Sequence, residues 1–302
     1  MKYINISFEN EQDKIKFVEK CELDFEKRLC EVSDRVKNAG AESLLLSGPT
    51  CSGKTTTANK IIHDFEQSGK KVTVISLDNF FKPRTERRKV DGEEKIDYDS
   101  VNALDLDILT RCVNAARLGK SVDIPVYDFI TQSTSHYETY NIDENGVIIF
   151  EGIQAVYPEI TRLFKDRDYV GVFINVDEDV MINDIYFSRD DIRLSRRIVR
   201  DYKFRGASAE FTLFLWENVR DNEDKSIYPN KNAICKIQLD SFMEYELFLL
   251  KGYIIDILDE VDKTSKYYNK AQELKEKFLK LDCISYDYVP RTSLYTEFLG
   301  KK

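Results

Sequence analysis

The spacing of apolar residues along the chain changes repeatedly between helical and strand-like. Between Ile15 and Val36 they recur at helical spacing, which predicts an amphipathic helix ahead of the first strand. Short apolar runs predict strands at residues 43–47, 72–77, 122–126, 147–150 and 169–176. Helical patterns cover residues 54–67, 106–118, 179–219, 242–250 and 266–281. Because strands and helices alternate, we predict an α/β fold with a parallel sheet flanked by helices.

One compact domain with a helical extension at each end is the simplest division of the chain. No internal repeat or low-complexity linker interrupts the sequence. We assign residues 1–40 to an N-terminal helical extension, 41–251 to the α/β domain and 252–302 to a C-terminal helical extension. The charged stretch from Lys82 to Asp99 is expected to be a loop.

Composition and charge narrow the classes of protein. The formal net charge of −9 argues against general nucleic-acid binding, which needs an extended basic face. The apolar runs are strand-sized, far from the ~20 residues that cross a bilayer. The N-terminus lacks the layout of a secretion signal, so we expect a cytoplasmic protein without a membrane partner. The six cysteines are scattered, which favours reduced thiols over disulfides or a zinc site.

A glycine-rich segment between the predicted strand 43–47 and the predicted helix 54–67 carries the clearest chemistry. Gly48-x-x-x-x-Gly53-Lys54-Thr55 has the spacing and the flanking elements of a phosphate-binding loop (P-loop). Its glycines let backbone N–H groups converge on phosphate oxygens at a helix N-terminus. Lys54 can then reach the β- and γ-phosphates, and the Thr55 hydroxyl can ligate Mg²⁺. We predict a site for ATP with Mg²⁺ formed by Gly48, Pro49, Thr50, Cys51, Ser52, Gly53, Lys54, Thr55 and Thr56.

Two acidic residues follow predicted strands, where α/β sheets bind their ligands. Asp78 ends the strand 72–77 and could accept the proton of an attacking hydroxyl while contacting the magnesium shell. Glu151 ends the apolar run 147–150 and is a candidate magnesium carboxylate. A turn or helix-cap role for Asp78, and simple strand termination at Glu151, are the alternatives.

A basic cluster between Arg189 and Arg205 gives this part of the chain a positive net charge, opposite to that of the whole chain. It holds seven basic residues against three acidic ones, a balance of +4. Four arginines fall at i, i+3, i+4 and i+7 and so share one helical face: Arg193, Arg196, Arg197 and Arg200. Guanidinium groups bind two phosphate oxygens at once, so beside a P-loop this helix is typical of a lid over the phosphates. A solvated, salt-bridged surface helix is the alternative.

In their order along the chain, these segments resemble the uridine kinase and phosphoribulokinase family of P-loop enzymes. Besides the P-loop, the matching segments are Val74-Ile-Ser-Leu-Asp78-Asn-Phe-Phe81-Lys82, Ile96-Asp97-Tyr98, Pro125-Val-Tyr127-Asp-Phe129, Ile149-Phe-Glu151-Gly152-Ile153 and Arg193-Leu-Ser-Arg-Arg197-Ile-Val-Arg200-Asp201 with Arg205-Gly206. The long N-terminal helix and residues 289–300 are similar to a bacterial uridine-kinase-like subgroup. The resemblance implies the P-loop NTPase fold with an arginine-rich helical lid at about residues 189–207.

The resemblance also implies roles for individual residues. Asp78 would be the catalytic base, with Lys54, Arg197 and Arg200 acting on the transferred phosphoryl group and Arg205 contacting nucleotide phosphates. The magnesium ligands would be Thr55, Asp78 and Glu151. The acceptor site would consist of Asp97, which holds the ribose hydroxyls in the family, together with Phe81, Tyr127, Phe129, Gln132 and Arg197.

Three positions depart from the family's pyrimidine-reading residues. Gln132 stands where the uridine/cytidine enzymes have a histidine, Ala207 where the lid has an arginine, and Leu215-Trp216 where a Gln-Tyr pair follows. A site built to hydrogen-bond its ligand loses binding heavily when those groups change. The base of the acceptor is therefore left open.

Together these features predict an ATP-dependent kinase that phosphorylates a small hydroxyl-bearing metabolite, with the 5′-hydroxyl of a uridine- or cytidine-like nucleoside as the leading acceptor. A kinase for another small alcohol, such as a sugar phosphate or a pantothenate-like molecule, is one alternative. A non-enzymatic ATP-binding switch is another. Asp97 and Tyr127 favour a ribose-bearing acceptor, whereas the changed base-reading positions favour the switch. The family's enzymes are commonly oligomeric, so the resemblance also allows a homo-oligomer.

Overall fold

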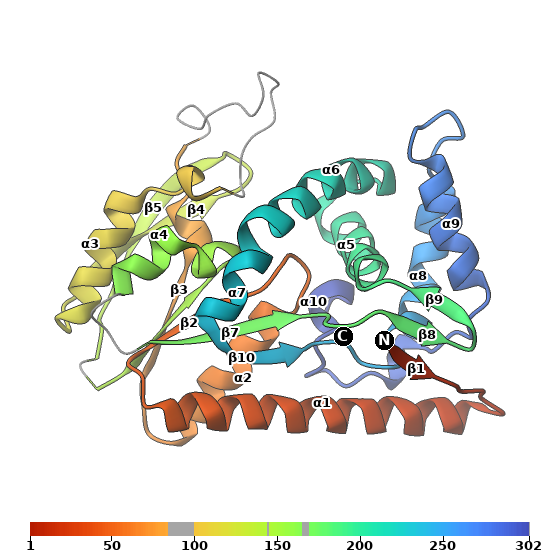
Figure 1. The fold of residues 1–302 in the computed structure, drawn as a ribbon, viewed down its shortest axis with the longest axis horizontal. Coiled ribbons are helices and arrows are strands. Elements are labelled where there is room, and N and C mark those ends of the chain that lie inside the picture. Colours follow the sequence, from red (N-terminus) through yellow and green to blue (C-terminus); the bar gives the residue numbers. More distant parts are fainter. Residues whose placement is uncertain (84–99, 144, 165–168, 302) are drawn as a thin grey trace.

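A sheet of five parallel strands forms the centre of the molecule, in the order β10-β7-β2-β6-β3 (Figure 1). The computed structural model describes residues 1–83, 100–143, 145–164 and 169–301. The five strands are β2 (Ser43–Ser47), β3 (Val72–Ser76), β6 (Val147–Glu151), β7 (Tyr169–Asn175) and β10 (Cys235–Asp240). β2 is buried along its whole length, as a central strand covered on both faces must be. The predicted parallel sheet is confirmed.

Helices cover both faces of this sheet. In β2, Leu44 and Leu46 belong to a core shared with α1 (Glu11–Ala39) and α2 (Lys54–Gln67), whereas Leu45 belongs to a second core with α3 (Leu106–Arg117). Figure 1 shows α1 running along one side of the molecule with the strands above it. The strand alternation therefore sorts neighbouring leucines into two layers, as a period of two requires.

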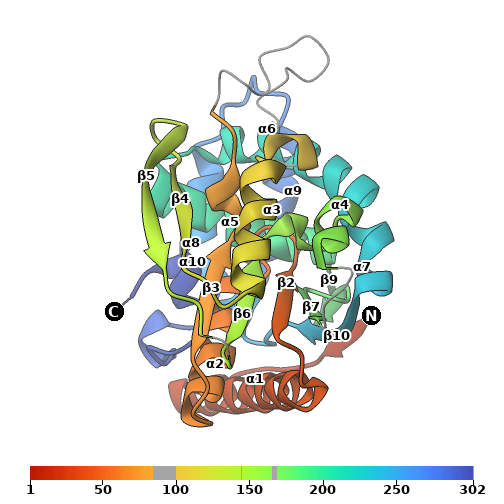
Figure 2. The same ribbon diagram turned by 90° about the vertical axis from the view of Figure 1, so that its left-hand side faces the viewer.

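The predicted strand at residues 122–126 lies outside the parallel sheet. It is part of β4 (Val122–Asp128), which pairs antiparallel with β5 (Ser133–Tyr140) in a separate hairpin beside α3 (Figure 2). β5 was not predicted because its residues, Ser133-Thr-Ser-His-Tyr-Glu-Thr-Tyr140, are mostly polar and exposed. This hairpin carries the aromatic residues of the predicted acceptor site.

The helical pattern predicted from residue 179 is wrong over its first part. Residues 180–187 form β8 (Val180–Ile182) and β9 (Ile185–Phe187), and β1 (Lys2–Ile4) adds to β8 in parallel. Asn183 and Asp184 have φ of 45° and 68°, as a two-residue hairpin turn of this kind requires. The helix α5 (Arg189–Arg205) starts only after Ser188, which caps it together with Asp191.

The remaining elements are short or lie towards the C-terminus. They are η1 (Leu77–Phe80), η3 (Val101–Ala103), η4 (Ile153–Val156), α4 (Pro158–Thr161), η5 (Arg162–Phe164), α6 (Ala209–Asn222), the π-helical η6 (Glu223–Ile227), α7 (Tyr228–Ile234), α8 (Glu246–Asp259), α9 (Tyr268–Leu279), η7 (Tyr286–Tyr288) and α10 (Thr296–Leu299). Across the described ranges, no helix combines the length and apolarity needed to cross a membrane.

Both terminal extensions contribute to the core of the α/β domain. Buried residues of α1, such as Phe25, and of the C-terminal part, such as Phe278, Tyr295 and Phe298, lie in the same hydrophobic cluster as Leu44 of the central strand. In particular, α10 contacts α5, the helix that carries the basic cluster. The C-terminal residues are therefore close enough to the P-loop to take part in its structure.

Candidate nucleotide-binding and phosphoryl-transfer site

The P-loop, residues 48–55, connects the end of β2 to the start of α2. Gly48 has no room for a side chain, because an added Cβ would lie 2.2 Å from the Ile174 carbonyl oxygen. Gly53 has φ +93° and precedes α2 without a side-chain cap. The amides of the first turn are thus available to an anion, which is the geometry expected of a triphosphate site.

Polar groups of the loop converge on its inside. The Lys54 ammonium donates to the carbonyl oxygens of Gly48 at 2.9 Å and Pro49 at 3.1 Å. Thr55 is exposed and Thr56 is half-buried, whereas Ser52 Oγ is buried and has no hydrogen-bond partner among the described residues. An orphaned hydroxyl beside glycines that cannot carry side chains fits a loop that accepts phosphate oxygens.

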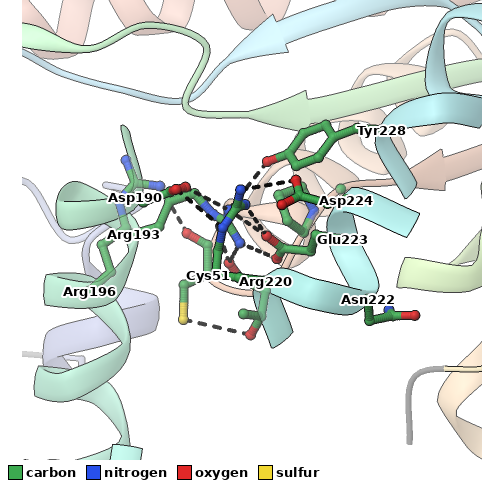
Figure 3. Close-up of polar contacts among 12 residues, drawn as sticks. Cys51, Asp190, Arg193, Arg196, Arg220, Asn222, Glu223, Asp224 and Tyr228 are labelled. Atoms are coloured by element: carbon green, nitrogen blue, oxygen red, sulfur yellow. Dashed lines mark hydrogen bonds and ion pairs between the residues drawn. The ribbon is translucent and has the colours of Figure 1, made fainter. Parts of the chain in front are cut away.

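Two arginines of α5 donate hydrogen bonds to backbone carbonyl groups of the P-loop (Figure 3). Arg193 donates to the Thr50 carbonyl oxygen at 3.2 Å and forms a buried, two-pronged ion pair with Glu223. Arg196 donates to the Cys51 carbonyl oxygen at 3.0 Å and is paired in the same way with Glu246. These hydrogen bonds fix the positions of two P-loop carbonyl groups. We call Arg193 and Arg196 the inward pair.

The other arginines of the cluster have a different environment. Arg197, Arg200 and Arg205 gather around the single carboxylate of Asp201, at 3.2, 2.7 and 3.5 Å. We call these three residues the outward trio. Three guanidinium groups and one carboxylate leave surplus positive charge. The predicted common face therefore divides into two groups with different partners.

Two predicted acidic residues come together at the ends of adjacent strands. Glu151 ends β6 opposite Ser76 of β3, whose hydroxyl donates to it at 2.7 Å. Asp78 follows two residues later in η1. Burial and the nearby Glu151 charge raise the pKa of Asp78 to about 6, while Lys54 and Arg205 act against this shift. A carboxyl group with this pKa is suited to accept a proton near neutral pH.

Hard oxygen ligands for Mg²⁺ are present at this place. Asp78, Glu151 and the Thr55 hydroxyl offer the donor types that Mg²⁺ takes alongside phosphate oxygens. Among the described residues, no cluster of three or more acidic, histidine or cysteine side chains forms a dedicated metal cage. This donor set fits a metal that arrives with a nucleotide.

Three aromatic rings from two parts of the chain lie together, and one of them, Phe81, follows Asp78 by three residues. Phe81, after η1, contacts Tyr127 of the hairpin at 5.6 Å between ring centroids and Phe129 at 6.1 Å. Tyr127 and Phe129 are themselves 5.1 Å apart. Tyr127 is held near η1 by its backbone N–H, which donates to Asn79 at 3.3 Å. The predicted aromatic cluster is therefore assembled from two distant segments.

Of the other predicted acceptor-site residues, the structure describes Gln132 but not Asp97. Gln132 adopts φ 54° in the turn between β4 and β5, and its Oε1 is buried without a partner among the described residues. An amide oxygen in that condition is available to a ligand donor. Asp97 lies outside the described residues, so its predicted role in holding ribose hydroxyls stays a prediction.

Some residues that shape the site were not expected from the sequence. Glu223 and Glu246, which neutralise the inward pair, lie 30 and 50 residues beyond their arginines, and no spacing rule connects them. Leu294 and Glu297, near the C-terminus, contact Gly53 and Thr56 of the P-loop region. A long-range contact of this kind leaves no local pattern in the sequence.

The loop between a central parallel strand and a helix, with carboxylates at the neighbouring strand ends, defines a P-loop kinase-type fold. The model of the "Phosphoribulokinase / Uridine kinase family" matches residues 44–238, and the chain belongs to this family. Membership makes it a phosphotransferase that acts on a hydroxyl group. The resemblance expected from the motifs is thus confirmed.

Relatives with 32–34% sequence identity agree with this assignment. The chain is 32% identical to uridine-cytidine kinase B of Dictyostelium discoideum over 62% of this chain and 69% of that protein. It is 34% identical to a uridine kinase of Staphylococcus epidermidis over 62% of this chain and 81% of that protein. With uridine-cytidine kinase A of Dictyostelium discoideum, the match spans only 33% of the relative. A solved structure described as a possible uridine kinase from Bacillus stearothermophilus superposes with TM-score 0.49 at 17% identity, over 72% of this chain and all of that one.

Proposed function

We propose that this protein transfers the γ-phosphoryl group of ATP to the 5′-hydroxyl of a nucleoside. The observation that carries the proposal is the meeting of Lys54, Asp78 and Glu151 at the carboxyl ends of β2, β3 and β6, beside an aromatic cluster. The nucleoside kinases among its relatives support the nucleoside as acceptor class. Which nucleobase the acceptor carries is left open in this proposal.

Each group has a chemical task in this proposal. Asp78 orients the acceptor hydroxyl and takes its proton as the new O–P bond forms, while the bond from the γ-phosphorus to the bridging oxygen breaks and ADP leaves. Lys54, with Arg197 and Arg200, stabilises the negative charge on the transferred phosphoryl oxygens. A magnesium ion held by Thr55, Asp78 and Glu151 would supply further charge neutralisation. Arg205 contacts the nucleotide phosphates in the same arrangement.

The acceptor is proposed to lie on the hairpin side of this site. Phe81, Tyr127 and Phe129 provide apolar faces on which a base can stack, and Gln132 offers an unpaired amide oxygen. Asp97 would hold the ribose. Since Gln132 replaces a histidine at the base-reading position, a different small alcohol is the second candidate acceptor.

A panel of acceptors tests this proposal. The purified protein is incubated with ATP, Mg²⁺ and a series of nucleosides, sugar phosphates and pantothenate-like alcohols, and ADP release is recorded. Release that depends on a nucleoside supports the proposal. Release with another alcohol alone selects the second candidate, and tight ATP binding without any acceptor-dependent release would instead identify a nucleotide-binding switch.

Two substitutions locate the chemistry. We expect Lys54→Ala and Asp78→Asn each to lower turnover by well over tenfold. Asp78→Asn should largely spare ATP affinity, because Asp78 as the catalytic base acts on the acceptor hydroxyl. Lys70→Ala and Asp34→Asn, at exposed positions, are matched controls and should leave turnover unchanged. Near-normal turnover of the Asp78 variant would remove this residue from its role.

A further inference from the structure

The C-terminal segment 293–300 lies directly against the P-loop. Leu294 is fully buried, and its Cδ1 lies 2.4 Å from the position that a Cβ on Gly53 would occupy. Three residues later, the Glu297 carboxylate accepts a hydrogen bond from the Thr56 hydroxyl at 3.4 Å. Thr56 is in the first turn of α2, the turn whose amides face the phosphates. The segment therefore borders the predicted triphosphate site.

Several contacts keep this segment in place. Tyr295 is completely buried, and its hydroxyl donates to Glu246 at 2.9 Å, the same carboxylate that pairs with Arg196. The guanidinium of Arg196 also lies 5.4 Å from the ring centre of Phe298, which is buried too. A segment anchored by two buried aromatic residues on an ion pair is a permanent part of the site rather than a displaceable tail.

Glu297 brings a carboxylate into the electrostatic field of the P-loop cations. Burial raises the pKa of Glu297, and the positive charges of Lys54, Arg200 and Arg196 act against this rise by favouring the carboxylate. Within the described ranges, Glu297 forms no ion pair of its own. The carboxylate therefore partly neutralises cations that a phosphate chain would use, and bound phosphate oxygens would meet a like charge nearby.

We propose that Glu297 is a specificity-determining residue for the phosphate donor: its negative charge weakens nucleotide binding, and weakens it more as the phosphate chain carries more charge. The inference rests on the proposed function only in that a nucleotide binds the P-loop. It concerns neither the acceptor nor the proton transfer. Removing the charge must therefore tighten triphosphate binding more than diphosphate binding and leave an uncharged nucleoside unaffected.

The test compares Glu297→Gln with the unchanged protein. Glutamine removes the charge but keeps the side-chain size and an oxygen that can accept the Thr56 hydrogen bond. Dissociation constants for ATP, ADP and adenosine are measured by calorimetry with Mg²⁺ at constant ionic strength. We expect the ATP constant to fall by about threefold or more, which is the scale of the repulsion between two unit charges ~7 Å apart in water. The ADP constant should fall less and the adenosine constant should not change.

Controls separate the possible results. Glu276→Gln removes the same charge from an exposed position of α9 and should leave all three constants unchanged. Raising the salt concentration should shrink the difference between Glu297→Gln and the unchanged protein, since screening weakens a purely electrostatic effect. Unchanged ATP affinity in Glu297→Gln overturns the inference, and so does weaker affinity, which would mean that the carboxylate binds the nucleotide or its metal directly. If the unchanged protein does not bind ATP at all, the proposed function fails instead.

Discussion

The inward pair and the outward trio share one helix and one residue type, yet their surroundings differ. Each arginine of the inward pair is paired with a buried glutamate, Glu223 or Glu246, and also binds a P-loop carbonyl. Glu223 is shared with Arg220. The members of the outward trio share Asp201. Charge is balanced in the first group and in surplus in the second.

This difference shows how arginines that hold the P-loop in place can be distinguished from arginines that are available to bind phosphate. A fully buried guanidinium is tolerated only with a paired carboxylate, and such a pair then fixes whatever else it touches. A group with surplus positive charge near the P-loop retains attraction for phosphate oxygens. We therefore assign the inward pair to holding the P-loop and propose the outward trio as the phosphate-binding arginines.

The largest effect should come from removing an outward arginine. Arg200→Ala is expected to lower kcat/KM by about a thousandfold, because arginines on transferred phosphoryl groups contribute at this scale. Its melting temperature should stay close to that of the unchanged protein. Arg200→Lys should recover only part of the rate, since lysine lacks the two-pronged geometry. A large loss of stability with normal turnover would erase the distinction between the two groups.

Breaking the ion pair between an arginine of the inward pair and its glutamate should lower the stability of the protein instead. Arg196→Met leaves Glu246 as an uncompensated buried charge, which costs about 3–5 kcal/mol in the free energy of unfolding. Urea denaturation measures this change. The double variant Arg196→Met, Glu246→Leu should recover much of the loss, because neither charge is then buried alone. A single variant as stable as the unchanged protein would contradict the supporting role.

The pH dependence should give the smallest effect and link Asp78 to the outward trio. With a pKa of about 6 in the free protein, Asp78 is deprotonated and able to accept a proton above that pH. As the pH falls below 6, kcat/KM should drop about tenfold per unit, because only the carboxylate form acts as base. Arg205→Ala should move this limb to higher pH, since Arg205 helps to keep Asp78 ionised. An unshifted limb would show that Arg205 does not act on Asp78.

Much of the sheet could be predicted from the sequence, because a buried strand requires a short run of apolar residues that can be recognised locally. β2 and α2 have the predicted bounds, since an apolar run, a glycine loop and a helical period follow one another there. β10 was missed although its residues alternate between buried and exposed, Cys-Lys-Ile-Gln-Leu-Asp. The Asn183-Asp184 turn between two apolar triplets likewise gave a hairpin signal that the surrounding helical pattern concealed.

The candidate site could be predicted only where its residues lie in continuous motifs. The P-loop, Asp78, Glu151 and the aromatic residues were found because strand ends and glycines mark their places. Arg197 pairs with Asp201 four residues later in the same helix, a spacing that can be read locally, whereas Arg196 pairs with Glu246, 50 residues away. The pair between Arg196 and Glu246 depends on tertiary contacts between α5 and α8, which no local spacing reveals.

The contact between Thr56 and Glu297 joins residues that are 241 positions apart. During synthesis at ~5–20 residues per second, the loop emerges from the ribosome roughly 10–50 s before the residues that pack on it. Until Leu294 and Glu297 have been translated, the P-loop lacks the contacts that these two residues make with Gly53 and Thr56. The contact between Glu297 and Thr56 therefore forms late in biogenesis, only after α10 has been translated.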